Sequence, residues 1–294
     1  MEYQLRSHNV RVIRAIFNRL CSTRDKLYLF LAKCIVIILK ISSVRLMSMT
    51  KERIVPLVKM PYQLPIFLRA NSFREFRRAG FCFREESTTK WIEECSKEGG
   101  VLYDIGANVG AVSLLYAANV MKNHKVVPES SIIAFEPTPE TYSALCGNIS
   151  VNRWNGRILP LNIPMSDKSS MGFLNITSES AGTSGHSFNS SLNKAQTTKD
   201  EPITIPMISQ SIDRLVNDFK LPSPDWLKID IDGLDFIALK GAEKLLKAGK
   251  IKSILIEKNE HEDEIRSFIK NFGFIEVNIE ERISENINLR FDRP

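Results

Sequence analysis

The sequence is poor in the residues that form disulfide frameworks or structural metal sites. It has only five cysteines, an odd number, and they are widely spaced: Cys21, Cys34, Cys82, Cys95 and Cys146. No C-x-x-C pair is present, and no histidine stands at metal-binding spacing from a cysteine. Because zinc sites and disulfide scaffolds need such patterns, the sequence predicts neither, and it favours a reducing, cytoplasmic location.

Two nucleotide-related motifs are also absent. The dinucleotide fingerprint G-x-G-x-x-G does not occur, which argues against an NAD-type oxidoreductase. A nucleic-acid N6 methyltransferase would carry an [ND]PP[YF] block after the fourth strand of its sheet, where this chain reads KIDIDG. No recognised nucleic-acid-binding motif is visible either. We therefore expect no nucleic acid partner.

The excess of positive charge lies near the N-terminus. Of the 294 residues, 43% are hydrophobic and 25% are charged, so one globular domain with an appendage is expected. Residues 1–90 hold 18 Lys and Arg against 6 Asp and Glu, whereas residues 91–294 hold 22 against 28. The basic character therefore says little about a site in the C-terminal part.

Residues 1–50 are predicted to form a basic, apolar helical segment. The run LYLFLAKCIVIILKISSV, from Leu27 to Val44, is apolar but contains two lysines. Basic residues at intervals of seven form one stripe on a helix: Arg19, Lys26, Lys33 and Lys40. This pattern favours a helix lying peripherally in an anionic membrane surface. Two alternatives stay open, packing on the following domain or on a second subunit, and a membrane span, which the lysines disfavour.

After a connector, residues 51–83, the chain from 84 to 294 alternates short β-rich runs with helical stretches. This alternation is typical of an α/β domain with helices on both faces of a parallel sheet. The helical sequence FREESTTKWIEEC leads into it. The expected strands are Val101–Asp104, Ser131–Phe135, Arg157–Asn162, Trp226–Asp230, Ser253–Glu257, Phe274–Ile279 and one near Asn286–Phe291. The expected helices are Gly110–Met121, Pro139–Asn152, Ser209–Phe219, Phe236–Ala248 and Glu262–Asn271.

The segment Thr177–Asp200 is rich in Ser, Thr, Gly and Asn and has no apolar period. A polar stretch of this length inside a domain is either a binding loop or disordered. We favour a binding loop over the site.

The stretch VLYDIGANVG predicts a nucleotide-like ligand. Gly106 and Gly110 follow the first strand of the sheet, where glycines permit a tight turn and a close approach. The acid at Asp104 would repel a pyrophosphate but suits a ligand that carries an ammonium and a sulfonium, which is S-adenosylmethionine. Glu136, at the end of the second strand, can accept both ribose hydroxyls of that ligand.

Four ordered blocks resemble those of the FkbM-type S-adenosylmethionine-dependent methyltransferases, over residues 84 to 280. They are YDIGANVGAVSLLYA, IIAFEPTPETYSALCGNISVN, LNIPMSDKSS and WLKIDIDGLDFIALKGAEKLL, the last followed by KSILIEKN. The resemblance implies a Rossmann-like, seven-stranded class I methyltransferase fold and O-methylation of sugar or polyketide hydroxyls. Residues 1–80 inherit nothing from it.

The resemblance also assigns roles to residues. It places Asp104, Gly106, Asn108 and Gly110 in the first cofactor block and Glu136 at the ribose, and it places Ser166 and Asp167 near the adenine. Asp230 and Asp232 match the K-I-D-x-[ED]-G segment, where the family often has Glu at the position of Asp232.

Methyl transfer to a hydroxyl needs an aligned acceptor and a general base. Lys228, Asp230 and Asp232 alternate at the end of a strand and so share one face. We expect Asp230 to be the base or the acceptor-orienting group, with Asp232 second; alternatively, both carboxylates only satisfy loop amides or cap the next helix. His186, in the polar segment, is a further candidate base; alternatively, it is a surface histidine or a substrate contact.

The sequence thus predicts an S-adenosylmethionine-dependent O-methyltransferase acting on a sugar, glycan or related hydroxylated acceptor. The rival interpretation from a different class is a catalytically silent module that keeps the cofactor fold for binding.

Overall fold

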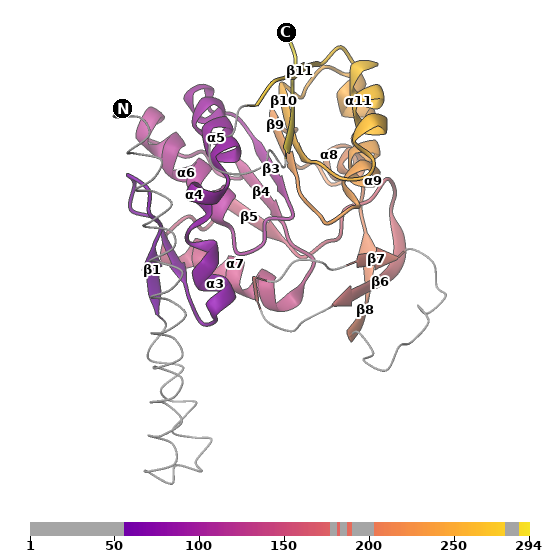
Figure 1. Cartoon of the computed structure of the whole chain (residues 1–294). Helices are drawn as coiled ribbons and strands as arrows, with labels where there is room; N and C mark the ends of the chain where they lie inside the picture. The colour runs from indigo at the N-terminus through magenta and orange to yellow at the C-terminus, as the bar shows by residue number, and fades with distance from the viewer. Residues whose placement is uncertain (1–55, 177–180, 183–186, 190–202, 280–287) are drawn as a thin grey trace, which may run out of the picture. The chain divides into compact units, whose positions relative to one another are not determined.

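A computed structural model describes residues 56–176, 181–182, 187–189, 203–279 and 288–294. The predicted N-terminal helical segment lies outside these ranges. The centre of the described part is a seven-stranded sheet (Figure 1). Its strands, in spatial order, are β11 (Ile275–Val277), β12 (Asn288–Asp292), β10 (Ser253–Glu257), β9 (Trp226–Ile229), β3 (Leu102–Ile105), β4 (Ile132–Phe135) and β5 (Ile158–Leu161). This confirms the predicted Rossmann-like, seven-stranded α/β fold.

The five strands from β10 to β5 are parallel, which aligns their carboxyl ends. Ile105 of β3 pairs with Phe135 of β4 and with Ile229 of β9. The residues that follow these partners, Gly106, Glu136 and Asp230, therefore meet at one edge of the sheet, where ligands bind in open α/β sheets. β12 differs from the predicted parallel pattern, because it runs antiparallel to both β10 and β11.

Helices cover both faces of the sheet (Figure 1). One apolar core forms beneath α5 (Glu86–Glu98), α6 (Ala111–His124) and α7 (Pro139–Val151). The other forms beneath α8 (Ile212–Asn217), α9 (Asp235–Lys240), α10 (Glu243–Lys247) and α11 (Glu262–Lys270). Since successive strand residues face opposite sides, Leu102 packs in the first core and Tyr103 in the second.

The predicted helix Phe236–Ala248 is two helices, α9 and α10. The backbone at Gly241 passes so close to the loop after β5 that a Cβ would lie 2.3 Å from the Ser166 carbonyl oxygen. The Gly241 carbonyl oxygen accepts the Asp213 amide (2.8 Å), and the Asp213 carboxylate accepts the amides of Lys244 and Leu245 (2.8 and 3.0 Å). Asp213, in α8, therefore caps a second helix where one continuous helix was expected.

A second, three-stranded antiparallel sheet was not predicted. It consists of β6 (Ser170–Ile176), β7 (Ser187–Asn189) and β8 (Ile203–Ser209). In β6, Gly172, Leu174 and Ile176 are buried while the residues between them are partly or fully exposed, which is the period of a strand. Ser209, expected to begin a helix, ends β8, and α8 begins after its N-cap Ser211. The predicted binding loop Thr177–Asp200 includes β7 and otherwise lies mostly outside the described residues.

The predicted connector also contains regular structure. The described part of it forms a hairpin of β1 (Leu57–Lys59) and β2 (Phe67–Arg69), followed by α3 (Phe73–Arg78) and α4 (Phe81–Arg84). Ser72 and Glu75 form a capping box at the start of α3. No helix within the ranges that the structure describes is long and apolar enough to cross a membrane.

Asn148 of α7 connects this hairpin with the turn after β3. Its side chain is fully buried, accepts the Arg69 amide (2.7 Å) and donates to the Val109 carbonyl oxygen (2.8 Å). Asn148→Ala removes both bonds and leaves two buried backbone groups without partners. We expect the free energy of unfolding to fall by about 2–4 kcal/mol, measured by urea denaturation. The exposed Asn271→Ala serves as the control and should change it by less than about 0.5 kcal/mol; equal losses in both variants would refute this role of Asn148.

Candidate active site

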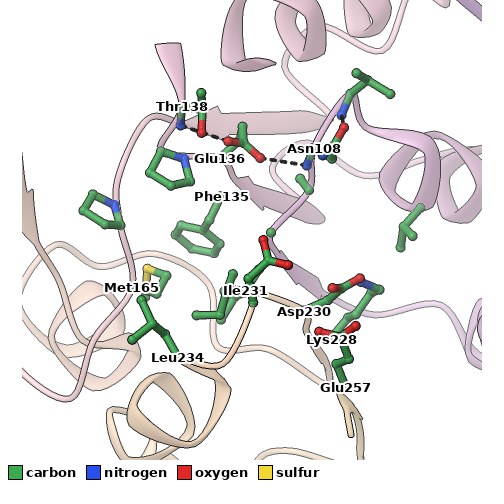
Figure 2. Close-up of a pocket in the computed structure, with 18 of the residues that line it drawn as sticks. Asn108, Phe135, Glu136, Thr138, Met165, Lys228, Asp230, Ile231, Leu234 and Glu257 are labelled. Atoms are coloured by element: carbon green, nitrogen blue, oxygen red, sulfur yellow. Dashed lines mark hydrogen bonds and ion pairs between the residues drawn. The ribbon is translucent and has the colours of Figure 1, made fainter. Parts of the chain in front are cut away.

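A cavity opens at the carboxyl edge of the parallel strands (Figure 2). Its walls come from the turn after β3, the ends of β4 and β10, the loops after β5 and β9, and the segment from α3 to α5. Its charged lining residues are Arg78, Glu85, Glu136, Lys228, Asp230, Asp232 and Glu257. The structure thus brings five predicted site residues to one cavity: Gly106, Asn108, Glu136, Asp230 and Asp232.

The turn after β3 requires glycine at two positions. Gly106 has a φ of +82°, and a Cβ there would lie 1.9 Å from the carbonyl oxygen of Asp230. Gly110, the N-cap of α6, has a φ of +89°, and a Cβ there would lie 2.5 Å from Leu145 of α7. Gly106 therefore lets this turn touch the backbone after β9 and contributes to the cavity wall. Gly110 allows α6 to begin against α7 and lies behind the wall.

Glu136 connects the turn after β3 with the loop after β4. Its Oε2 accepts the Asn108 amide (3.0 Å), and its Oε1 accepts the Thr138 amide (2.9 Å) (Figure 2). Asn108 has a φ of +50°, and its side-chain oxygen accepts the Val109 amide (3.0 Å). Burial raises the pKa of Glu136 to about 7, although the hydrogen bonds from Thr138 and Asn108 oppose the rise. Glu136 is therefore a fixed acceptor at the position expected for the ribose contact.

Asp104 is buried and does not line the cavity. Its Oδ2 accepts the amide and the hydroxyl of Ser113 in α6 (3.1 and 2.6 Å). Its Oδ1 is buried and has no hydrogen-bond partner among the described residues. Burial raises the pKa of Asp104, and the charge of Lys228 and the Ser113 hydroxyl oppose the rise. In the structure, Asp104 ties the first turns of α6 to β3.

An ion pair between a buried lysine and a partly exposed aspartate lies at the end of the cavity away from Glu136 (Figure 2). Lys228 is 3% exposed, and its Nζ donates to Asp230 Oδ2 at 2.6 Å. Burial by itself would lower the pKa of Lys228, but the carboxylates of Asp230, Asp104 and Glu85 raise it, so the lysine stays protonated. Asp230 is thereby held as an ion-paired carboxylate just after β9.

Glu257 is the second carboxylate at this end of the cavity (Figure 2). Since Ile256 pairs with Ile229, Glu257 and Asp230 occupy adjacent positions on neighbouring parallel strands. Within the part of the chain that the structure describes, no hydrogen bond or ion pair holds the Glu257 carboxylate. Burial, followed by the charges of Asp230, Asp235 and Asp232, raises its pKa to about 7. A carboxylate in this state can accept a proton near neutral pH.

The loop after β9 is ordered by Asp235, the first residue of α9. Its Oδ1 accepts the Ile231 amide (3.0 Å), and its Oδ2 accepts the Gly233 amide (3.0 Å) and the Asn259 side chain (2.9 Å). Asp232 lies between these anchor points with a φ of +51° and borders the cavity. The loop is thus held in the shape that presents Asp230 and Asp232.

The end of the cavity near β5 is largely apolar. It is lined by Phe135, Ile163, Met165, Leu174, Phe188 and Leu234. Ser166 and Asp167, expected near the adenine, line an adjoining cavity, and Met165, Phe188 and Leu234 border both cavities. The Ser166 hydroxyl donates to Asp167 Oδ1 (3.1 Å). Ser166 and Asp167 therefore lie next to the apolar end of the first cavity but do not line it.

Two further sequence expectations concern His186 and a metal site. His186, the third candidate base, falls outside the described ranges. Across the ranges that are described, no group of three or more His, Cys, Asp or Glu side chains is arranged to hold a metal ion.

Sequence reasoning gave no role to three charged residues of the cavity, although it placed one of them, Glu257, at the end of a strand. Arg78 and Glu85 belong to the segment before the sheet, where the sequence carries no motif that points to the site. Glu257 does carry a signal, because ILIE ends a strand in an acid just as IIAFE does at Glu136. If the acid that ends ILIE had been given the same weight as the acid that ends IIAFE, Glu257 would have been predicted as a site residue.

Comparison with known proteins identifies a matching family. Residues 104–276, more than half of the chain, match the family model of the Methyltransferase FkbM domain. The hexuronic acid methyltransferase AglP of Haloferax volcanii is 26% identical over 173 residues. These residues make up 59% of this chain and 62% of AglP, so the chain matches less than two thirds of that relative.

Solved structures of methyltransferases also match in part. Methyltransferase FkbM from Methylobacillus flagellatus KT is 15% identical, with a TM-score of 0.46 over 66% of this chain and 44% of the other. The M1A22 tRNA methyltransferase TrmK from B. subtilis is 16% identical, with a TM-score of 0.39 over 70% of this chain and 65% of the other.

Proposed function

The chain belongs to the FkbM methyltransferase family, and we propose that it transfers a methyl group from S-adenosylmethionine to a hydroxyl of a sugar-containing acceptor. The observation that carries the proposal is the fixed Glu136 carboxylate beside the Gly106 turn at the edge of the sheet. It is the arrangement that a nucleoside with two free ribose hydroxyls requires.

The cavity fits the donor at three places. At Gly106 the backbone lies so close to the Asp230 carbonyl oxygen that a residue with a side chain cannot occupy this position. Glu136 can accept the ribose hydroxyls, and the apolar end near Met165 and Leu234 suits the adenine ring. Asn108 would hold the Glu136 carboxylate in position. The roles of Gly110 in the cofactor turn and of Ser166 and Asp167 near the adenine stay predictions, since these residues do not line the cavity.

The acceptor would meet the carboxylates at the ends of β9 and β10. When bound, the cofactor supplies a methyl group activated by a positively charged sulfur. Asp230, held by Lys228, would orient the acceptor hydroxyl, and Glu257 would accept the proton that this hydroxyl loses on methylation. We prefer Glu257 as the base because, within the described residues, no hydrogen bond or ion pair holds its carboxylate, whereas Asp230 forms an ion pair with Lys228. The cavity walls limit access of water.

The acceptor class rests on the relative AglP, whose name describes a hexuronic acid methyltransferase. A hydroxylated sugar also suits a cavity end that is lined by carboxylates, since these accept hydroxyl hydrogen bonds. We extend the proposal to a lipid-linked glycan at an anionic membrane surface. Support for that extension comes from the basic stripe of residues 1–50 alone.

The proposal is tested with S-adenosylmethionine that carries an isotope-labelled methyl group. The full chain is incubated with uronic acid glycosides, neutral glycosides and total tRNA, and the products are separated and analysed by mass spectrometry. Label in a glycoside supports the proposal. Label in tRNA would replace the sugar by a nucleic acid acceptor. Cofactor binding without any labelled product would favour the silent binding module.

Glu136→Gln is expected to weaken binding of S-adenosylhomocysteine by about 10- to 100-fold, because one hydrogen bond of the charged acceptor is replaced by an amide donor. Binding is measured by calorimetry.

Since Glu136 has a pKa of about 7, the affinity of the parent protein should rise as the pH increases through about 7. The variant should lose this rise. Glu140→Gln, on the exposed first turn of α7, is the control. An affinity that is the same in Glu136→Gln and in the control would contradict the ribose assignment.

A further inference from the structure

Two charged side chains of the cavity come from outside the family match. Arg78 is the last residue of α3, and Glu85 directly precedes α5. Both line the cavity, although the match to the family begins at residue 104. The segment before the sheet therefore contributes one cation and one anion to the same wall.

Both side chains are held in place. Arg78 donates from Nε and Nη2 to the Gly182 carbonyl oxygen, at 3.2 Å in each case. Glu85 Oε2 accepts the Thr88 hydroxyl of α5 (3.4 Å), and α5 is fixed to the sheet because Trp91 Nε1 donates to the Ser253 hydroxyl (2.8 Å). The two charges are thus fixed parts of the wall.

The charged groups that affect the pKa of Glu85 and of Glu136 indicate where Glu85 and Arg78 lie along the cavity. Burial raises the pKa of Glu85, while the charges of Lys228 and Arg78 oppose the rise. Arg78 also lowers the pKa of Glu136. Glu85 therefore lies near the end of β9, and Arg78 lies within electrostatic reach of both Glu85 and the ribose carboxylate.

If S-adenosylmethionine lies across the carboxyl ends of the strands, the part of it beyond the adenine and the ribose reaches Arg78 and Glu85. The sheet order places β5, β4, β3 and β9 side by side. With the adenine at the β5 end and the ribose on Glu136 after β4, the remainder of the ligand crosses Gly106 toward β9. Asp104, the acid expected there from the sequence, is buried and bonded to Ser113. Among the described cavity acids on that side, Glu85 interacts with Lys228 through its charge, but the ion pair of Lys228 is with Asp230 and the proposed acceptor chemistry does not use Glu85.

We propose that Glu85 and Arg78 bind the zwitterionic α-amino-acid end of S-adenosylmethionine, the Glu85 carboxylate pairing with the ammonium group and the Arg78 guanidinium with the carboxylate. This inference rests on the proposed function. It makes the segment from α3 to α5 part of the cofactor site.

The test compares two ligands by calorimetry with the full chain. S-Adenosylhomocysteine carries the amino-acid end, and 5′-methylthioadenosine lacks it. Glu85→Gln and Arg78→Gln should each weaken binding of S-adenosylhomocysteine by at least about 10-fold and leave binding of 5′-methylthioadenosine within about 2-fold. Unchanged binding of the second ligand also reports that the variants are folded. The matched controls are Glu86→Gln and Arg77→Gln, at the adjacent positions.

The outcomes separate the inference from the proposed function. An unchanged affinity for S-adenosylhomocysteine in both variants would overturn the inference, and so would equal losses for the two ligands, which indicate a general distortion of the cavity. If the unaltered protein bound neither ligand, the proposed function itself would fail, and the inference with it. A loss confined to S-adenosylhomocysteine supports the assignment.

Discussion

Gly106→Ala is expected to weaken binding of S-adenosylhomocysteine at least about 100-fold and to lower the free energy of unfolding by about 2–4 kcal/mol. The added Cβ would lie 1.9 Å from the Asp230 carbonyl oxygen, on a backbone whose φ is +82°. The turn after β3 and the loop after β9 must then separate, which moves Asp230 as well. Calorimetry and urea denaturation measure the two effects.

Gly156→Ala is the matched control for this change. Gly156 has nearly the same φ, +79°, but a Cβ there would meet nothing within 4 Å. It therefore carries only the cost of a left-handed backbone, about 1–2 kcal/mol, with no effect on binding. If Gly106→Ala behaved like Gly156→Ala, the close contact with Asp230 would have no role in the site.

Glu257→Gln is expected to lower kcat roughly 100- to 10,000-fold, the usual contribution of a general base. The measurement uses the acceptor that the labelling experiment identifies. Affinity for S-adenosylhomocysteine should change by less than about 2-fold, because Glu257 faces the acceptor and not the donor. Since its pKa is about 7 and the ionised form is the base, the kcat of the parent enzyme should rise with pH through about 7 and then level off.

The pH profile separates a base from a residue that only shapes the cavity. Glu257→Gln should lose the rise in kcat near pH 7. Asp230→Asn should keep a rise, shifted to lower pH because the Asp230 charge raises the pKa of Glu257, and should lower the maximal kcat. Glu129→Gln, in an exposed loop, is the control for the substitution itself. A Glu257→Gln enzyme that kept both its rate and its pH profile would return the role of base to Asp230.

The parallel core of the fold and the placing of Gly106, Asn108 and Glu136 at one cavity could be predicted from the sequence because their signals are local. The strands around Asp104 and Glu136 are apolar runs, fully buried in the structure, that end in a turn. The turn requires glycine because the chain passes from a strand directly into the following helix. Both elements can be predicted from the adjacent sequence. Such features depend on neighbours in the chain.

What the sequence did not predict depends on contacts between distant segments. Gly241 interrupts a helix because the loop at Ser166 packs against it, and helical periodicity alone cannot reveal that neighbour. Arg78 and Glu85 reach the cavity only because the segment from α3 to α5 packs on the sheet. The role of Asp104 likewise depends on Ser113, which the packing of α6 against β3 brings to it.

The antiparallel strand β12 has a consequence for any attempt to produce a shortened version of this protein. The stretch that defines the family ends at residue 276, before β12, and begins after α5. A fragment cut to that stretch would leave the backbone of β10 unpaired on one side, along a strand that includes Ile254 and Ile256. Exposed apolar strand borders recruit other chains, so such a fragment would be prone to aggregation.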